Sequence, residues 1–248
     1  MRNESADNPN LHQSLKDYEP AYLEYLQSAP EDGAQFGALR RWMASCGVAA
    51  SARLVDVGCG SGKFVRYLRS QQFSAVGIEP AEALFDEFLR PEACFFHGSL
   101  EEWERSADAA TNVDVVTAFD VLEHVDDPVS LILGAKKIVR PGGLVLLTTP
   151  DAGSIAASIL GKHWPHFNKY HRSLMKTAHI KALGALAGLE IVSIGHMARY
   201  KSLHYVTSYI LNFGLRSGRS FKQWPIADAV FPINTFDVFF VCLRRPAE

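Results

Sequence analysis

The sequence predicts an α/β protein built on a doubly wound, mostly parallel sheet, and two observations carry this prediction. Short apolar runs alternate along the chain with amphipathic segments of helical spacing, which is the pattern of parallel strands joined by crossover helices. A turn with three glycines follows the first apolar run, and a helical pattern follows the turn. At 248 residues the chain is long enough to bury the core of one such domain.

Seven apolar runs predict the strands. They cover residues 54–57, 75–78, 94–97, 113–119, 144–149, 189–194 and 235–243. Helical spacing of apolar residues predicts helices over residues 10–30, 36–46, 64–68, 81–89, 129–139 and 177–187. The basic stretch 199–222 also has apolar residues at helical spacing, which predicts a helical insertion before the last strand.

The net charge of −2 hides two parts of opposite sign. Residues 1–151 hold 13 Lys and Arg against 23 Asp and Glu, whereas residues 152–227 hold 10 basic residues and one acid, Glu190. Such asymmetry indicates an interaction surface. We expect the basic part to face an anionic substrate or an anionic membrane surface. Docking on the acidic part of the same chain or of a neighbour is the alternative.

The cysteines and the first residues bear on the compartment. The four cysteines are scattered, without a C-x-x-C pair that would suggest zinc or redox chemistry. The first seven residues are polar and acidic and lack the apolar core of a signal peptide, and no apolar run is long enough to span a bilayer. We therefore expect a cytoplasmic protein.

The glycine turn is the most informative motif. Asp56 lies at the end of the first strand, and Gly58, Gly60 and Gly62 follow at alternate positions. Glycines let a backbone approach a ligand closely, and the start of the next helix offers free N–H groups. The second strand ends at Glu79, where a carboxylate can accept both hydroxyls of a ribose. Together these residues predict a nucleoside-binding βαβ unit.

The glycine spacing separates two classes of nucleoside site. Dinucleotide sites of nicotinamide-dependent oxidoreductases show G-x-G-x-x-G, whereas this chain reads G-x-G-x-G over residues 58–62. A pyrophosphate has no use for a carboxylate beside its cradle, whereas a ligand with a cationic amino group suits Asp56. An oxidoreductase is therefore the less favoured alternative.

At these residues the chain resembles the class I S-adenosylmethionine-dependent methyltransferases, which have a seven-stranded Rossmann-like sheet with an antiparallel last strand. The resemblance implies S-adenosylmethionine as the cofactor. It implies that Asp56, Gly58 and Gly60 surround the methionine moiety and that Glu79 holds the ribose. The other positions implied to contact the cofactor flank these residues, adjoin the adenine or lie at the mouth of the methionine pocket: Cys59, Gly62, Pro80, Ser99, Leu100, Phe119 and Asp120.

The resemblance also divides the chain into three parts of one domain. Residues 1–50 are expected to form an N-terminal helical cap, and residues 51–150 the S-adenosylmethionine-binding core. Residues 151–248 are expected to supply a substrate lid, a helical insertion and the last two strands.

Residues 119–128 narrow the resemblance. They are similar to the branch that contains the ubiquinone-biosynthesis O-methyltransferases and their relatives that act on small molecules and sugars, and residues 140–143 and 148–150 agree with that branch. With the basic part of the chain, this implies methyl transfer, preferentially to oxygen, on an anionic or lipid-linked small molecule. A catalytically silent methyltransferase fold that serves as a binding or scaffold subunit is the alternative.

Imidazoles and aromatic residues gather after the fourth strand and in the irregular segment 164–171, which we call the lid. We expect His124 and His171 to act in catalysis, because a histidine base raises the reactivity of a hydroxyl near neutral pH. We expect substrate contacts from Glu123, His166, Tyr170 and Arg172. Loop ordering and lid packing are the structural alternatives for these side chains.

The sequence favours neither a metal nor nucleic acid as a partner. Glu123, His124, Asp126 and Asp127 lie on one short segment, where adjacent side chains converge poorly on one ion, and no second acidic cluster follows the fifth strand. We therefore expect no metal. The basic residues are not interleaved with aromatics in an RNA-binding pattern. The stretch 199–222 suits peripheral membrane contact, a cover over the active site or a homodimer seam.

Overall fold

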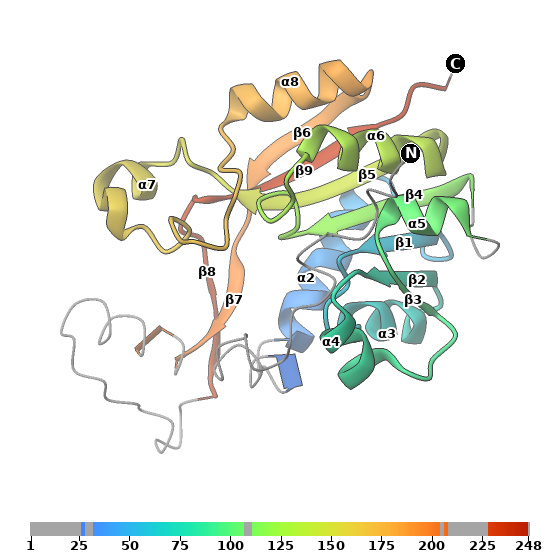
Figure 1. The fold of residues 1–248 in the computed structure, drawn as a ribbon. Helices are drawn as coiled ribbons and strands as arrows, with labels where there is room; N and C mark the ends of the chain where they lie inside the picture. Colours follow the sequence, from blue (N-terminus) through green and yellow to red (C-terminus); the bar gives the residue numbers. More distant parts are fainter. Residues whose placement is uncertain (1–25, 28–31, 107–110, 204–205, 208–227, 248) are drawn as a thin grey trace, which may run out of the picture.

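A seven-stranded sheet forms the centre of the protein in the computed structural model, which describes residues 26–27, 32–106, 111–203, 206–207 and 228–247 (Figure 1). Its strands lie in the order β3-β2-β1-β4-β5-β9-β6. All neighbours pair in parallel except β9, which is antiparallel to both β5 and β6. The strands are β1 (Arg53–Val57), β2 (Ser74–Glu79), β3 (Phe95–His97), β4 (Val113–Phe119), β5 (Val139–Pro150), β6 (Glu190–His196) and β9 (Val238–Arg244). The predicted doubly wound sheet is confirmed.

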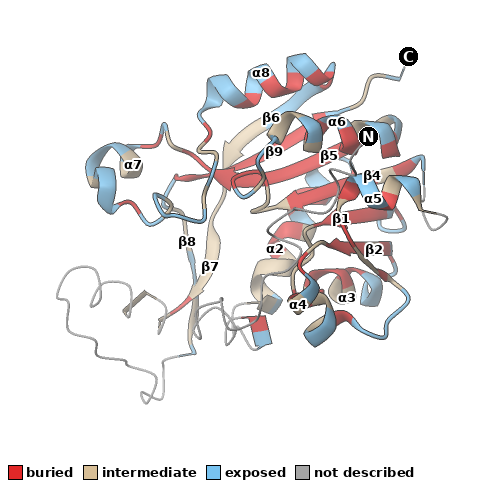
Figure 2. Ribbon diagram, viewed as in Figure 1, coloured by how far each residue is buried: buried red, intermediate tan, exposed pale blue. Residues whose placement is uncertain are grey.

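Both faces of the sheet are covered by apolar clusters. Successive residues of a strand point to opposite faces, so a continuous apolar run contributes to both clusters. On β5, Val145 and Leu147 belong to one buried cluster, and Leu144 and Leu146 belong to the other. The first cluster includes residues of α5 (Leu100–Arg105), α6 (Pro128–Ile138) and α8 (Thr177–Ala187); the second includes residues of α2 (Asp32–Ser45) and α3 (Lys63–Ser70). Figure 2 shows the buried strands between helices whose outer faces are exposed.

The order of the strands reverses direction at β1, and this reversal places the ligand site. The chain first builds outward through β2 and β3, then returns to the other side of β1 with β4. At such a switch point the loops after the two central strands diverge and leave a crevice at the carboxyl ends of the strands. The glycine turn follows β1 at this crevice.

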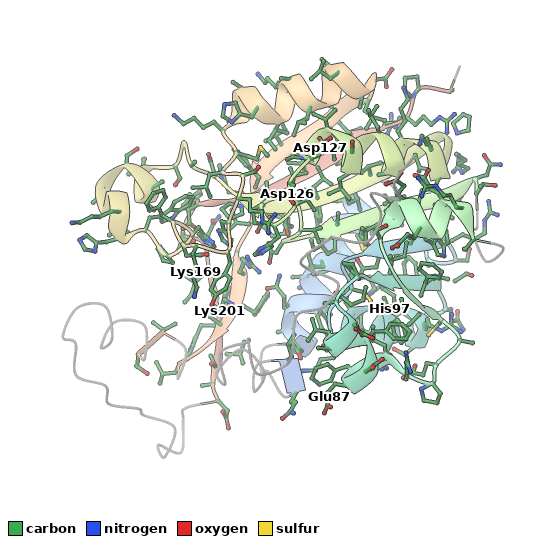
Figure 3. The ribbon with its side chains drawn as sticks, in the orientation of Figure 1. Glu87, His97, Asp126, Asp127, Lys169 and Lys201 are labelled. Atoms are coloured by element: carbon green, nitrogen blue, oxygen red, sulfur yellow. The ribbon has the colours of Figure 1, made fainter. Side chains whose placement is uncertain are left out.

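Two helix starts show why the sequence folds locally as it does. Gly62 caps α3 in the left-handed region (φ 72°), and a Cβ there would lie 2.6 Å from both Leu89 and Phe95, so only glycine fits. Asp127, labelled in Figure 3, caps α6. Its side chain accepts hydrogen bonds from the amides of Val129 and Ser130, and Pro128 occupies the first helical position.

Several element boundaries differ from the sequence-based expectation. The segment 81–89 is helical but splits into α4 (Glu82–Leu84) and the π-helical turn η3 (Phe85–Leu89). Helices α5 and α7 (Ile155–Leu160), with the 3₁₀ turn η4 (Gly161–His163), were not predicted, because they span only two turns or fewer and show little periodicity. The last strand begins at Val238, because Phe236 adopts φ 52° in a turn closed on the Asn234 side chain.

The expectation of a helix from residue 199 is wrong at its start. Residues Arg199–Ser202 form β7, which pairs antiparallel with β8 (Val230–Ile233) in a separate two-stranded sheet. The backbone hydrogen bonds of this pairing join residues that are at least 28 positions apart in sequence (Ser202 and Val230), and they override the helical spacing of the apolar residues. Most of the predicted insertion, and most of the predicted helix over residues 10–30, lies outside the described residues.

Candidate active site

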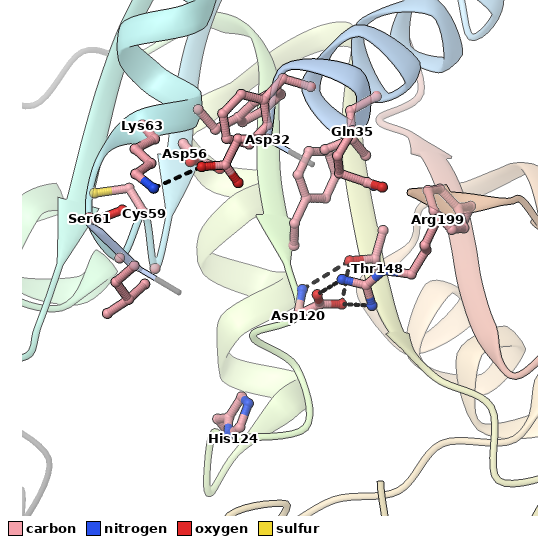
Figure 4. A pocket seen from close by; sticks show the side chains of 18 residues that line it. Asp32, Gln35, Asp56, Cys59, Ser61, Lys63, Asp120, His124, Thr148 and Arg199 are labelled. Atoms are coloured by element: carbon pink, nitrogen blue, oxygen red, sulfur yellow. Dashed lines mark hydrogen bonds and ion pairs between the residues drawn. The ribbon is translucent and has the colours of Figure 1, made fainter. Parts of the chain in front are cut away.

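A cavity of about 310 Å³ lies at the carboxyl ends of β1, β4 and β5 (Figure 4). The glycine turn and the start of α3 form one wall, and α2 closes it with Asp32, Gln35 and Phe36. Asp120, Thr148 and Arg199 lie on the opposite side, and His124 lines the end toward the lid. This size suits a ligand of the size of a nucleoside.

The glycine turn is held against the ends of the first two strands. The amides of Gly58 and Cys59 both donate to the Ile78 carbonyl oxygen, at 2.8 and 3.0 Å. Gly58 has φ 69°, and a Cβ on it would lie 2.7 Å from Val121. The backbone therefore passes close to the loop after β4, and Gly58, Cys59 and Gly60 remain to line the cavity.

Asp56 is a buried acid at the edge of the cavity. One of its oxygens accepts a 2.6 Å hydrogen bond from the Thr117 hydroxyl. Burial raises the pKa of Asp56 to about 7, although the Thr117 hydrogen bond acts in the opposite direction. A cationic amino group in the cavity would stabilise the carboxylate, which is the role predicted for Asp56.

Glu79 joins the second strand to the glycine turn. Its Oε2 accepts from the Gly60 amide at 2.8 Å, and its Oε1 accepts from the Ala81 amide at 2.9 Å. Burial raises the pKa of Glu79 to about 7. The carboxylate thus lies against the glycine turn and is 5% exposed. For the predicted contact with a ribose, the carboxylate has to become accessible to the ligand.

The residues predicted beside the adenine have local structural roles. Ser99 caps α5: its hydroxyl accepts from the Glu102 amide, and its own amide donates to the Glu102 carboxylate. Leu100 is buried in the core between α5 and α6. Neither residue lines the cavity, nor does Pro80 or Gly62. Their contacts with the cofactor stay predictions.

Asp120 holds the centre of the opposite wall. It adopts φ 55°, its amide donates to Thr148, and the Thr148 hydroxyl donates back to its carboxylate at 2.8 Å. Arg199 of β7 forms an ion pair with the same carboxylate at 2.6 Å. Burial alone would raise the pKa of Asp120, but the charge of Arg199 and the Thr148 hydroxyl together lower it.

Three histidines meet between the loop after β4 and the lid. The rings of His124 and His171 lie edge to face with centroids 4.8 Å apart, and His166 stacks on His171 at 5.7 Å. Burial lowers the pKa of His124 and of His166, and burial together with the neighbouring His124 lowers the pKa of His171 to about 4. The lowered pKa values favour the uncharged form of all three imidazoles at neutral pH.

Glu123 lies beneath the histidines and anchors the segment that follows the lid. Its Oε2 accepts from the Thr149 hydroxyl at 3.0 Å, and its backbone oxygen accepts from the amides of Arg172 and Ser173. Burial and the charge of Asp120 raise the pKa of Glu123 to about 8. With 2% of its surface exposed, Glu123 does not line the cavity, so its predicted substrate contact is not direct in this arrangement.

Two further predicted substrate residues, Tyr170 and Arg172, do not line the cavity. Arg172 pairs with the exposed Asp126, while Tyr170 is 43% exposed and has the Lys169 amino group over its ring at 4.9 Å. The polar cavity residues that were not predicted as site residues are Asp32, Gln35, Ser61, Lys63, Thr148 and Arg199. Lys63 and Asp32 form an ion pair at 2.8 Å that links the glycine turn to α2, but no local sequence pattern marks it.

Comparison with known proteins decides the family. The family described as "Methyltransferase domain" matches residues 22–194, which include β1 to β5 and the lid. This chain belongs to that methyltransferase family. It is a class I S-adenosylmethionine-dependent methyltransferase, and S-adenosylmethionine is its cofactor.

Two relatives of this methyltransferase are named ubiquinone biosynthesis O-methyltransferases. The protein of Pseudomonas aeruginosa (strain LESB58) is 28% identical over 156 residues, which cover 58% of this chain and 67% of that protein. The protein of Aromatoleum aromaticum is 32% identical over 108 residues, which cover 40% of this chain and 44% of that protein. About a third of the first relative and more than half of the second thus lie outside the matched region.

Solved structures share the fold of the methyltransferase. A protein of Archaeoglobus fulgidus described as a SAM-dependent methyltransferase has a TM-score of 0.61 at 14% identity, covering 91% of this chain and 100% of that chain. Magnesium protoporphyrin IX methyltransferase of Synechocystis, with bound SAH, has a TM-score of 0.53 at 14% identity, covering 85% and 81%. At these identities the likeness concerns the fold alone.

Proposed function

We propose that this methyltransferase transfers the methyl group to a hydroxyl oxygen of an anionic or lipid-linked small molecule. The observation that carries the proposal is the continuity of the two halves of the site. One cavity is lined by Asp56 and the glycine turn on the cofactor side, and by His124 on the side of the lid. S-adenosylmethionine supplies an electrophilic methyl group on a sulfonium, so the protein has mainly to hold the acceptor oxygen in line with it.

The cofactor half is proposed to act through charge and backbone. Asp56 pairs with the amino group of the methionine moiety, the glycine turn lies along the cofactor, and Glu79 takes the ribose hydroxyls. Gly58, Cys59, Gly60, Phe119 and Asp120 line the same cavity, which supports the predicted set. These acceptors favour a ligand that carries a cationic amino group and two vicinal hydroxyls.

The acceptor half is proposed to act through His124 and His171. The Nδ1 atom of His124 lies 3.0 Å from the Tyr170 carbonyl oxygen, and that of His171 lies 2.7 Å from the His166 carbonyl oxygen. Because a carbonyl oxygen only accepts, each uncharged ring carries its proton on Nδ1 and has a lone pair at Nε2. Two imidazole lone pairs beside the cavity are suited to activate an acceptor hydroxyl.

The charge and apolar surface around the lid support the choice of acceptor. Arg199 lines the cavity, and Lys169 and Lys201 lie on the lid side of the molecule (Figure 3). Ile155 and Ile159 of α7 are 78% and 77% exposed, and Phe167 of the lid is 61% exposed. Exposed apolar side chains beside basic ones suit an acceptor with an anionic head and an apolar tail.

The compartment is proposed to be the cytoplasm. All four cysteines are free thiols, although Cys59 and Cys94 are not fully buried, which suits a reducing environment. Within the described part of the chain, no helix has the length and apolar character needed to cross a membrane.

The test compares pairs of acceptors that differ only in charge. The protein is incubated with S-adenosylmethionine and hydroxyaryl carboxylic acids or their neutral methyl esters, and S-adenosylhomocysteine is quantified by chromatography. O-methylation of the acids at a kcat/KM at least tenfold above that of the esters would support the proposal. Cofactor binding without turnover on any acceptor would favour the silent scaffold, and methylation at nitrogen would contradict the choice of oxygen.

A further inference from the structure

Two cysteines from distant parts of the chain meet in the buried core. Cys46 directly follows α2, and Cys242 lies in β9. Both are buried free thiols in the apolar cluster that α2 and α3 share with the sheet. Their side chains are close enough to interact, although no local sequence pattern pairs them.

The packing of α2 along β9 places the two thiols together. The rings of Trp42 and Phe240 lie edge to face with centroids 5.1 Å apart. Cys46 follows Trp42 by four residues, about 6 Å along a helix, and its amide still donates to the Trp42 carbonyl oxygen. Cys242 follows Phe240 by two residues, about 6.7 Å along a strand, and lies on the same face of the sheet. These nearly equal steps bring Cys46 over Cys242.

A second cavity gives a small molecule access to one of the two cysteines. It has a volume of about 290 Å³ and lies at the amino ends of β1 and β4, at the opposite end of the sheet from the cofactor cavity. Cys46 lines it, whereas Cys242 does not and is 0% exposed. Arg140 and Arg244 also line it, and Asp114, which pairs with Arg140 at 2.7 Å, offsets part of their charge. Cys46 is therefore the thiol that a small oxidant in this cavity meets first.

The surroundings of the two sulfur atoms give them different reactivity. The interaction with Cys242 lowers the pKa of Cys46 to about 7 against the effect of burial, and the side chains of Ser193 and Ser45 act in the same direction as Cys242. The same interaction, together with burial, raises the pKa of Cys242. Because the thiolate is the form that attacks peroxides, Cys46 is the group that reacts first.

We propose that Cys46 and Cys242 form an oxidative modification site, which hydrogen peroxide converts to a disulfide. In the first step, the Cys46 sulfur forms a bond to one peroxide oxygen and the O–O bond breaks. The other oxygen takes up the thiol proton and leaves as water, so that Cys46 becomes a sulfenic acid.

Cys242 acts in the second step. Its sulfur forms the S–S bond, the S–O bond of the sulfenic acid breaks, and the released hydroxide takes up the Cys242 proton and leaves as water. Cys242 can react here because a neutral sulfenic acid lacks the charge with which Cys46 raises the pKa of Cys242. The two thiols lose two electrons in total, and one hydrogen peroxide is reduced to two waters.

The bond would tie α2 to the sheet at the end of the helix away from the cofactor. Asp32, Gln35 and Phe36 of the same helix close the cofactor cavity, and Phe240 of β9 lines it. The start of α2 is already joined to the glycine turn by the ion pair between Asp32 and Lys63. A helix held at both ends moves away from the cavity less readily, so exchange of the cofactor should slow on oxidation.

The test treats the reduced protein with hydrogen peroxide. Remaining thiols are alkylated after increasing times, and the digested protein is analysed by mass spectrometry. The wild type is compared with Cys46→Ala and Cys242→Ala, in which a small apolar residue suits the buried cluster, and with the control Cys94→Ala at a partly exposed thiol. Binding of S-adenosylmethionine checks that each variant is folded.

We expect a peptide pair joined through Cys46 and Cys242 in the wild type and in the control, and its separation by dithiothreitol. Cys46 should react at least about tenfold faster than Cys94. In Cys242→Ala, it should stop at a sulfenic acid that dimedone traps. S-adenosylmethionine should dissociate at least about threefold more slowly from the oxidised wild type than from the reduced one, and at an unchanged rate from peroxide-treated Cys242→Ala.

Two outcomes would overturn the site: oxidation of Cys94 while Cys46 and Cys242 stay reduced, or pairing of Cys46 with another cysteine. An unchanged dissociation rate in protein that carries the bond would refute the effect on α2. None of these measurements involves a methyl acceptor, so their outcome does not depend on the proposed function.

Discussion

At the scale of single residues, the two buried acids of the cofactor half make the stability of the folded protein depend on pH. Asp56 and Glu79 are each 5% exposed, and burial raises the pKa of both to about 7. Each carboxyl therefore holds its proton more tightly in the cofactor-free folded chain than in the unfolded chain. The folded state has an advantage that is fully present below about pH 4 and is lost as the pH rises through 7.

The first prediction concerns the stability of the cofactor-free protein. We expect Asp56→Asn to raise the free energy of unfolding by about 2 kcal/mol at pH 8 and to change it little at pH 4, because asparagine keeps the bond from Thr117 without a buried charge. Urea denaturation at both pH values measures this. The exposed Asp86→Asn serves as the control, and a destabilised Asp56→Asn protein at pH 8 would contradict the argument.

The second prediction concerns cofactor binding. The cationic amino group of S-adenosylmethionine favours ionised Asp56, so binding should release protons near pH 7, and affinity should rise between about pH 6 and pH 8. Calorimetry in buffers of different ionisation enthalpy counts the protons released. Asp56→Asn should lower both the affinity and the proton count; an unchanged count would assign the release to Glu79 instead.

At the scale of elements, close packing of the glycine turn against the π-helical turn and β3 decides which residues fit. Gly62 starts α3 in a left-handed conformation, with Leu89 on one side and Phe95 on the other. The lid is also held by a contact with a distant element. The indole N–H of the buried Trp164 donates a 2.9 Å hydrogen bond to Asp237, which directly precedes β9. Both features position functional loops through apolar or buried contacts to distant elements.

The third prediction tests the glycine turn. Gly62→Ala should lower the free energy of unfolding by at least about 2 kcal/mol, because the added Cβ would lie 2.6 Å from two side chains at an unfavourable φ. Gly33→Ala is the matched control, since Gly33 lies in α2 with no atom within 4 Å of the added Cβ. Alanine should be neutral or slightly stabilising there. Equal effects of the two substitutions in chemical denaturation would refute the packing argument.

At the scale of the whole molecule, the small sheet and the large sheet meet at the cavity. Arg199 of β7 reaches Asp120 at the end of β4, 79 residues away in sequence, and both line the cavity. This ion pair joins β7, on the side of the cavity proposed to receive the acceptor, to the end of β4, on the side proposed to bind the cofactor. A positive charge at this junction can favour anionic acceptors.

The fourth prediction tests this junction. Arg199→Gln should raise the KM for an anionic acceptor at least tenfold and change the KM for its neutral ester by less than threefold. Steady-state kinetics with the paired acceptors measures both, and Lys181→Gln on the exposed side of α8 provides the control. Equal loss for acid and ester would assign Arg199 a purely structural role at Asp120.

Much of the fold was predictable because its signals are local. The apolar runs of the seven strands, the positive-φ glycines at 58, 60 and 62 and the acid at Asp56 depend on neighbours a few residues away. The exceptions are elements whose conformation depends on distant pairing. Residues 199–202 have a helical pattern in their apolar neighbours but pair with β8.

The sequence by itself determined the α/β class, the glycine turn and the cofactor, because periodicity and motif spacing are properties of short segments. Only the tertiary structure decided which side chains meet across the cavity. It brought Arg199 to Asp120 and His171 to His124, and it set Glu123 beneath the histidines. Such meetings depend on strand order and on how the lid packs, and neither leaves a mark in the residues adjacent to each group.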